Sequence, residues 1–244
     1  MSEPLLRTKP GSFEAQPYSA RCHRVWERGD HLLIGVSPGN SYFSSQRIAE
    51  LVDWAGEHFT AVDLVYADLH VDTQFQAFGH PPEHALRRAA KEIKATARRI
   101  HRGVQESGRD GVRVRALSEF HADPEYRRLH RSVEEALLLD PVFRAAAEGM
   151  AHSFLAARLP EGSAPAPAQL AAGLRYISAE LPFFLDTPAL LGVASSVTCY
   201  HVELPLTPVL FGRSEGLRAV SAQAYAVVRP AGAAMPRATA AAAA

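Results

Sequence analysis

The chain is poor in cysteine, which limits the classes of protein to which it can belong. Its 244 residues include two cysteines, Cys22 and Cys199, far apart and in no CxxC or Cys/His cluster. Small disulfide scaffolds and cysteine-based zinc sites need more cysteines at closer spacing. We therefore expect a cytoplasmic protein that needs no disulfide.

Long hydrophobic runs are also missing. No stretch approaches the ~18 uncharged apolar residues that a transmembrane helix needs. Residues 1–19 contain prolines and charges of both signs but no apolar run of about 7–15 residues, so we expect no signal peptide.

The charges cancel, with 26 Lys and Arg against 26 Asp and Glu. Net charge therefore gives no argument for a nucleic-acid partner, and any such argument must rest on where the charges lie. There is no Walker loop and no GxGxxG motif at a strand–helix junction, so no nucleotide cofactor is indicated. Asp68, His70 and Asp72 alternate like metal ligands, but no further ligand stands in a convincing place, and we predict no metal.

What the chain does have is alternating strand and helix patterns, with 47% hydrophobic residues. Strands are expected at 31–37, 61–69, 112–117, 196–202 and 224–228. Helices are expected at 44–59, 83–107, 123–139, 141–158 and 166–181. This alternation predicts an α/β fold, a mostly parallel sheet with helices on both faces. We expect one domain at 29–229, a loosely ordered lead-in at 1–28 and a disordered Ala/Pro-rich tail at 230–244.

A serine follows the first expected strand, in the sequence Gly35-Val-Ser37-Pro-Gly-Asn40. Pro followed by Gly is typical of a type II turn, with Ser37 as its first residue and Asn40 as its fourth. Because ligands bind at the carboxyl ends of parallel strands, the turn would present a hydroxyl and an amide at such a site. An ordinary turn that happens to contain serine is the alternative.

The same residues fit the Gly-x-Ser-x-Gly nucleophile elbow of α/β-hydrolases. In that elbow the residue after the serine donates its N–H to the oxyanion, whereas Pro38 has none. Ser37 also lies on the first strand, which leaves no room for the earlier strands of a hydrolase. We therefore disfavour a serine hydrolase.

Tyr176 and Glu180 lie four residues apart in an expected helix and share a face. A phenol beside a carboxylate can hold an ammonium group. A solvent-exposed surface pair is the alternative.

Tyr200 and His201 end the expected strand at 196–202. Adjacent strand residues point to opposite faces, so only one of them should face a given cleft. Tyr200 is the candidate for proton transfer, and His201 would support the structure from behind.

The long helix at 83–107 is basic on one side. Arg87, Lys91, Lys94, Arg98 and Arg102 are spaced 4, 3, 4 and 4 residues apart and form one stripe, which Arg88 and Arg99 flank. The opposing apolar face is expected to consist of Leu86, Ala90, Ile93, Ala97 and Ile100. The stripe indicates a surface that contacts phosphates without reading sequence, with a merely solvated helix face as the alternative.

Together these segments resemble the cyclodipeptide synthases over about residues 31–230. The motifs that carry the resemblance are Leu33-Ile-Gly-Val-Ser-Pro-Gly-Asn-Ser-Tyr-Phe-Ser44, Val65-Tyr-Ala-Asp68, Ala116-Leu-Ser-Glu119, Pro124-Glu-Tyr126, Tyr176-x-x-x-Glu180-x-Pro182 and Ser195-Ser-Val-Thr-Cys-Tyr-His201. Asn40, Tyr200 and His201 match the signature of the family's Asn-Tyr-His branch.

The resemblance implies a fold like the catalytic domain of class I tyrosyl- and tryptophanyl-tRNA synthetases. It also implies an enzyme that joins two aminoacyl groups, taken from two aminoacyl-tRNAs, into a cyclic dipeptide without ATP. Ser37 would be the nucleophile, Tyr176 and Glu180 would hold the ammonium group, and Tyr200 would relay a proton. Asn40 and Tyr126 would position groups around it, and the basic helix would hold the first tRNA.

By family position, Leu33, Gly35, Leu117 and Phe183 should line the first aminoacyl pocket, and Met150 and Arg158 fall near the second. The first pocket is apolar, which favours a bulky hydrophobic amino acid. We expect a monomer. A non-catalytic tRNA- or RNA-binding module on a synthetase-like domain is the alternative, but it leaves Ser37 and Tyr176 without a purpose.

Overall fold

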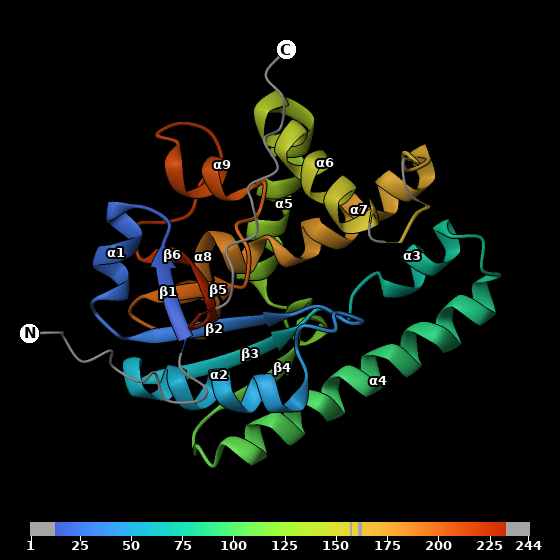
Figure 1. The fold of residues 1–244 in the computed structure, drawn as a ribbon. Coiled ribbons are helices and arrows are strands. Elements are labelled where there is room, and N and C mark those ends of the chain that lie inside the picture. The colour runs from blue at the N-terminus through green and yellow to red at the C-terminus, as the bar shows by residue number, and fades with distance from the viewer. Residues whose placement is uncertain (1–12, 157, 161–162, 233–244) are drawn as a thin grey trace, which may run out of the picture.

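A six-stranded sheet forms the centre of the protein (Figure 1), whose computed structural model describes residues 13–156, 158–160 and 163–232. Strand β1 pairs antiparallel with β6, and every other neighbouring pair is parallel. The mostly parallel sheet is therefore confirmed. The strands in spatial order are β1 (Phe13–Pro17), β6 (Gln223–Pro230), β5 (Ser196–Tyr200), β2 (His31–Val36), β3 (Ala61–Tyr66) and β4 (Arg113–Ala116).

Helices cover both faces of the sheet. Helices α2 (Ser45–His58) and α4 (Pro82–Ser107) pack on one face against β3, and α1 (Ala20–Trp26) and α8 (Pro182–Leu191) pack on the other against β5. The remaining helices are α3 (Val71–Ala77), α5 (Pro124–Leu139), α6 (Pro141–Ala156), α7 (Pro167–Glu180), α9 (Thr207–Gly212) and the 3-10 helix η1 (Leu117–Phe120). Because both faces are covered, β2 is buried at every residue except the half-buried Gly35.

The close crossing of α2 and α4 depends on a glycine. A Cβ built on Gly103 of α4 would lie 2.7 Å from the Cβ of Ile48 and 2.7 Å from the carbonyl oxygen of Ser45, and both of these residues belong to α2. The face of α4 that is buried consists of Ala85, Ala89, Thr96, Ile100 and Gly103.

The apolar face expected for this helix was therefore only partly right. Ile100 is buried, but Leu86 is 56% exposed and Ala90 is also exposed. Small residues on the buried face let α4 approach α2 closely, and Leu86 lies on the exposed face instead.

The expected lead-in is wrong for the residues that the structure describes within it. β1 pairs with β6, from Phe13 opposite Pro230 to Pro17 opposite Ala226. Ser19 caps α1 by accepting a hydrogen bond from the N–H of Cys22. Within the expected tail, β6 extends to Pro230, and residues 233–244 lie outside the described part.

Besides α1, the short helices α3, α8 and α9 were not expected. α8 begins at Pro182, which was taken only as the end of the preceding helix, although proline also suits the first turn of a new one. α3 and α9 have seven and six residues, too few for a clear periodic signal.

A buried polar network joins the amino ends of the parallel strands. The Nδ1 atom of His31 lies 2.8 Å from the hydroxyl oxygen of Ser196, and its Nε2 atom lies 3.0 Å from the carboxylate of Asp63. Arg113 of β4 donates to both oxygens of that carboxylate. Burial alone would raise the pKa of Asp63, but the hydrogen bonds from His31 and Arg113 lower it. The network aligns β5, β2, β3 and β4 from the end opposite to Ser37.

Candidate active site

A cavity of about 820 Å³ opens at the carboxyl ends of β2 and β5. Its walls come from the turn after β2, from α6, α7 and α8, and from the segment after β5. This is the position at which parallel α/β sheets bind their ligands. Ser37, Tyr176, Glu180 and Tyr200 all line it, although they lie far apart in the sequence.

The turn after β2 has the predicted geometry. Gly39 has a φ of 74°, and the N–H of Asn40 donates to the carbonyl oxygen of Ser37 at 3.2 Å. The side-chain oxygen of Asn40 accepts a hydrogen bond of 3.0 Å from the N–H of Tyr42. The turn is thereby tied to the chain that follows, and it presents the Ser37 hydroxyl to the cavity.

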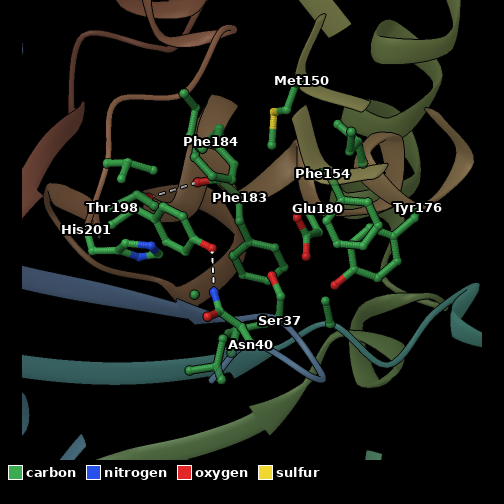
Figure 2. A pocket seen from close by; sticks show the side chains of 18 of the residues that line it. Ser37, Asn40, Met150, Phe154, Tyr176, Glu180, Phe183, Phe184, Thr198 and His201 are labelled. Atoms are coloured by element: carbon green, nitrogen blue, oxygen red, sulfur yellow. Dashed lines mark hydrogen bonds between the residues drawn. The ribbon is translucent and has the colours of Figure 1, made fainter. Parts of the chain in front are cut away.

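Tyr176 and Glu180 point from α7 into the same cavity, so the alternative of a surface pair is wrong (Figure 2). Burial raises the pKa of Glu180 to about 7, an effect that the hydrogen bond with Tyr176 opposes. Burial, followed by the negative charge of Glu180, raises the pKa of Tyr176 well above its usual value, whereas its interaction with the Ser37 hydroxyl acts in the opposite direction. Near neutral pH Glu180 can thus exchange a proton, while Tyr176 stays a neutral phenol.

Tyr200 approaches Ser37 from the other side. Its hydroxyl oxygen accepts a hydrogen bond of 2.9 Å from the Nδ2 atom of Asn40. Burial and then the charge of Glu180 raise the pKa of Tyr200 to about 12, against the effect of its hydrogen bonds with Asn40 and Ser37. Ser37 therefore lies within reach of two neutral phenols and next to one carboxyl group.

His201 also lines the cavity, contrary to the expectation that only one of Tyr200 and His201 would do so. The strict alternation ends because β5 stops at Tyr200 and the chain bends at His201. The His201 ring stacks on Tyr42 with ring centroids 4.0 Å apart. The backbone carbonyl oxygen of His201 accepts a hydrogen bond from Arg229. Burial, and after it the charge of Arg229, lowers the pKa of His201 to about 4, so the ring is neutral at physiological pH.

All six residues expected in the aminoacyl pockets line the cavity. The first group consists of Leu33, Gly35, Leu117 and Phe183, and the second of Met150 and Arg158. A Cβ built on Gly35 would meet nothing within 4 Å, so this glycine leaves room in the pocket.

Sequence analysis missed Phe154, which stacks on Tyr176 with ring centroids 5.6 Å apart. The guanidinium carbon of Arg158 lies 4.0 Å from the centroid of the Phe154 ring. Phe154 lies four residues from both Met150 and Arg158, and this helical spacing could have revealed it. Thr198 was missed as well; it points from β5 into the cavity and is surrounded by apolar residues in the sequence.

Comparison with known proteins matches this arrangement to one family. The model of the family described as cyclodipeptide synthase matches residues 13–230. The chain belongs to the cyclodipeptide synthase family. It is therefore an enzyme of the aminoacyltransferase class, not a non-catalytic binding module.

Individual synthases are similar over most of this chain. It is 40% identical over 227 residues to the cyclo(L-tyrosyl-L-tyrosyl) synthase of Mycobacterium tuberculosis (strain ATCC 25618 / H37Rv), covering 92% of this chain and 78% of that protein. It is 40% identical over 212 residues to the cyclo(L-leucyl-L-phenylalanyl) synthase of Streptomyces noursei, covering 86% of this chain and 89% of that protein.

A solved structure supports the fold assignment. It is that of a Mycobacterium tuberculosis protein, presented as showing that cyclodipeptide synthetases are related to type I tRNA synthetases. Its TM-score to this chain is 0.81 at 40% identity, covering 89% of this chain and 93% of that one. The expected class I synthetase-like fold is confirmed.

Tyr126 is placed differently in this synthase from the other motif residues. It is 2% exposed and does not line the cavity; its hydroxyl donates to the carbonyl oxygen of Ala179 at 2.8 Å. Ala179 precedes Glu180, so Tyr126 acts on the site by holding the last turn of α7.

The basic stripe of the synthase lies on the solvent side of α4. Arg87, Arg88, Lys91, Lys94, Arg98 and Arg102 are exposed, whereas Arg99 is half-buried and donates to the hydroxyl of Thr96 at 3.2 Å. Arg87 lies 3.6 Å from Glu83. Within the described residues, Lys91, Lys94, Arg98 and Arg102 form no ion pair and are open to a partner's phosphates.

The synthase has no hydrolase-like arrangement at Ser37. The Ser37 hydroxyl interacts with the phenols of Tyr176 and Tyr200. A Ser–His–Asp array does occur in the described structure, but it consists of Ser196, His31 and Asp63 and is buried at the opposite end of the sheet. Asp68 accepts two hydrogen bonds from Ser118, and the described part of the chain contains no cluster of three or more metal-ligating side chains. None of the described helices is both long and apolar enough to cross a membrane.

Proposed function

We propose that the chain closes two aminoacyl groups, taken from two aminoacyl-tRNAs, into a 2,5-diketopiperazine through an aminoacyl ester on Ser37. One observation carries the proposal. The Ser37 hydroxyl faces the cavity and interacts with the phenols of Tyr176 and Tyr200. The carboxyl group of Glu180 lies beside Tyr176 (Figure 2). Family membership supports the product class, and the geometry supports the order of the steps.

In the first step the Ser37 oxygen attacks the ester carbonyl of the first aminoacyl-tRNA. A new ester bond forms at Ser37, the bond to the tRNA ribose breaks, and the hydroxyl proton passes to the departing ribose oxygen. Formation of the enzyme ester divides one difficult reaction into separate displacements. Because the substrate arrives as an activated ester, ATP is not required.

The aminoacyl group on Ser37 carries an ammonium group, which Glu180 and Tyr176 hold. Glu180 has a pKa of about 7 because of burial, so it can also take the proton that the amine must lose. The free amine then attacks the ester of the second aminoacyl-tRNA. A peptide bond forms and the bond to the ribose of the second tRNA breaks. The attacking nitrogen passes a proton to the departing ribose oxygen, Glu180 releases its proton to the solvent, and a dipeptidyl group remains on Ser37.

Ring closure releases the product. The terminal amine of the dipeptide attacks the Ser37 ester, the second peptide bond forms, and the bond from the Ser37 oxygen to the acyl carbon breaks. The proton lost by the amine returns to the Ser37 oxygen through Tyr200, whose phenol Asn40 holds in place. The enzyme is left as it began.

The exposed cations of α4 supply the contact to tRNA. Phosphate contacts of this kind position a nucleic acid and carry no sequence information. The apolar pocket of Leu33, Gly35, Leu117 and Phe183 favours a bulky hydrophobic first amino acid, in line with relatives that are cyclo(Tyr-Tyr) and cyclo(Leu-Phe) synthases.

Several further features belong to this proposal. We propose one catalytic domain over residues 29–229, with residues 13–28 packed onto it, acting as a monomer in the cytoplasm without a cofactor. We also assign the chain to the Asn-Tyr-His branch on Asn40, Tyr200 and His201.

Mass spectrometry of the medium from a bacterium expressing the chain tests the function. We expect diketopiperazines from the wild type and none from Ser37→Ala. Ser132→Ala, a serine on α5 outside the cavity, is the matched control and should leave the yield unchanged. Diketopiperazines that persist in Ser37→Ala, or that never form in the wild type, would overturn the proposal.

A further inference from the structure

A second cavity, of about 240 Å³, adjoins the first on the other side of the Ser37 turn. Residues of α3 and α4 contribute to its walls, and the residues that line both cavities are Pro38, Gly39, Phe154, Arg158 and Tyr176. The two spaces therefore meet next to the proposed nucleophile. No role proposed above uses Gln74, Phe75 or Glu92, which line only the second cavity.

Gln74 carries an unsatisfied hydrogen-bond donor in the wall of this cavity. Its side-chain oxygen accepts a hydrogen bond of 2.8 Å from Arg158. A guanidinium group has only donors, so the amide oxygen of Gln74 must face it, and the amide nitrogen is left over. That nitrogen is buried without a partner among the described residues, and Gln74 as a whole is 5% exposed. Buried donors are nearly always paired, so this donor is available to an acceptor that enters the cavity.

The surrounding side chains suit a nucleobase. Phe75 and Phe78 present rings to the cavity, and the guanidinium group of Arg88 lies 5.0 Å from the ring of Phe75. Bases stack on aromatic rings and on guanidinium planes. A glutamine amide pairs with adenine by donating to N7 and accepting from the N6 amino group, and the Gln74 oxygen keeps one lone pair for this.

A carboxylate of α4 lies beside the turn that holds Ser37. A Cβ built on Gly39 would be 3.1 Å from an Oε1 oxygen of Glu92, which places this carboxylate beside the Ser37 turn. Carboxylates accept hydrogen bonds from ribose hydroxyls in nucleotide sites. Glu92 and Arg88 both belong to α4, so the cavity adjoins the basic stripe.

We propose that this second cavity binds the 3′-terminal adenosine of an aminoacyl-tRNA, with Gln74 recognising the adenine and Glu92 the ribose. The inference rests on the proposed function. When the ester carbonyl lies at Ser37 and its amino-acid side chain occupies the first cavity, the second cavity is the adjoining space that can receive the leaving ribose. The preceding phosphates then reach the cations of α4.

Binding of uncharged RNA tests this directly. The probes are two acceptor-stem minihelices labelled with fluorescein at the 5′ end, one ending in CCA and the other in CCG, and the readout is Kd by fluorescence anisotropy with the wild-type enzyme. Guanine presents two acceptors where adenine has an acceptor and a donor, so we expect the CCG probe to bind about tenfold more weakly.

The variant Gln74→Glu keeps the size of the side chain and its pairing with Arg158 but removes the donor. We expect it to bind both minihelices with the weaker Kd. Gln76→Glu makes the same change on an exposed side chain of α3 and should keep the preference for CCA. If Gln74→Glu fails to fold, Gln74→Met is measured in its place. Equal Kd values for the two probes with the wild type, or a preference that survives loss of the Gln74 donor, would overturn the inference.

The second aminoacyl group is the competing occupant of this cavity. In that case Gln74→Glu would change which diketopiperazines are made and leave both minihelix Kd values unaltered, which would also overturn the inference. Its failure remains distinct from failure of the proposed function, because wild-type diketopiperazine synthesis is measured separately and does not depend on discrimination between CCA and CCG.

Discussion

The side-chain amide of Asn40 donates a hydrogen bond of 2.9 Å to the hydroxyl oxygen of Tyr200, across 160 residues of sequence. This bond joins the turn after β2 to the end of β5. Because the amide occupies a lone pair of the phenol oxygen, the phenol's own proton stays available to Ser37 and the substrate. The backbone N–H of Tyr42 in turn fixes the amide by donating to its oxygen.

Replacing Asn40 with Asp should therefore impair ring closure. A carboxylate in that position accepts a hydrogen bond from the Tyr200 hydroxyl, so the phenol's proton no longer points to Ser37 and the substrate. We expect turnover to fall by about 10²-fold or more, the usual contribution of a positioned acid–base group. Ser37 should still become acylated, which intact-protein mass spectrometry would detect as a retained aminoacyl or dipeptidyl adduct. Tyr200→Phe should show the same pattern; normal turnover in either variant would contradict the relay.

Glu180 should make the stability of the fold depend on pH. Burial raises its pKa from 4.5 to about 7 in the folded protein. Between these values the unfolded chain releases a proton that the folded chain keeps, so stability falls as the pH rises through this range. Glu180→Gln avoids this cost, and its free energy of unfolding should exceed that of the wild type by up to about 3 kcal/mol at pH 8, with no gain at pH 4.

Urea denaturation at pH 4 and pH 8 measures this difference, and diketopiperazine synthesis by the same variant should be lost. Glu106→Gln, at an exposed position of α4, is the matched control and should show no such gain. A Glu180→Gln variant that is active at the wild-type rate, or whose stability differs from that of the wild type by the same amount at pH 4 and pH 8, would leave the carboxyl group without its proposed role.

Reversal of charge on α4 should abolish activity without unfolding the protein. In Arg98→Glu with Arg102→Glu, two exposed cations that are free of ion pairs in the described structure become anions. We expect no product at physiological salt. The slope of log Kd against log salt for an acceptor minihelix should decrease in magnitude by about 2, since each phosphate contact contributes about 0.9.

The comparison for this experiment is Arg127→Glu with Arg131→Glu. These arginines are also four residues apart and exposed, but they lie on α5. Activity should persist in this control. Equal effects of the two double variants would mean that overall charge, and not the stripe, determines tRNA binding.

Gly103→Ala should destabilise the fold, although alanine favours helix formation. The added methyl group would lie 2.7 Å from the side chain of Ile48 and from the backbone oxygen of Ser45, so α2 and α4 must move apart. Overpacking of this kind typically costs about 1–3 kcal/mol. Gly149→Ala in α6, where the nearest atom would be 3.9 Å away, should be neutral or stabilising. Chemical denaturation of the two variants tests the contrast.

Local patterns predicted much of the fold and the centre of the site. The Pro38-Gly39 turn and the helices expected at 44–59 and 83–107 depend on residues close in sequence, and the structure has the turn and, as α2 and α4, both helices. The motif match placed Ser37, Tyr176, Glu180 and Tyr200 in one site before any contact was known. The pairing of β1 with β6 had no local signal, because an edge strand of five residues is defined by a partner more than 190 residues away.

The sequence by itself determined the alternation of strands and helices along the chain, the serine turn, the basic stripe and the family. Each of these depends on residue type and on spacing along the chain. Only the tertiary structure decided which face of α4 is buried and that the Tyr126 hydroxyl donates to the carbonyl oxygen of Ala179. It also decided that the unpaired amide nitrogen of Gln74 lies in the wall of a second cavity. These depend on which atoms fill the space around a side chain. That space is shared by elements distant in sequence, so no spacing within one segment encodes it.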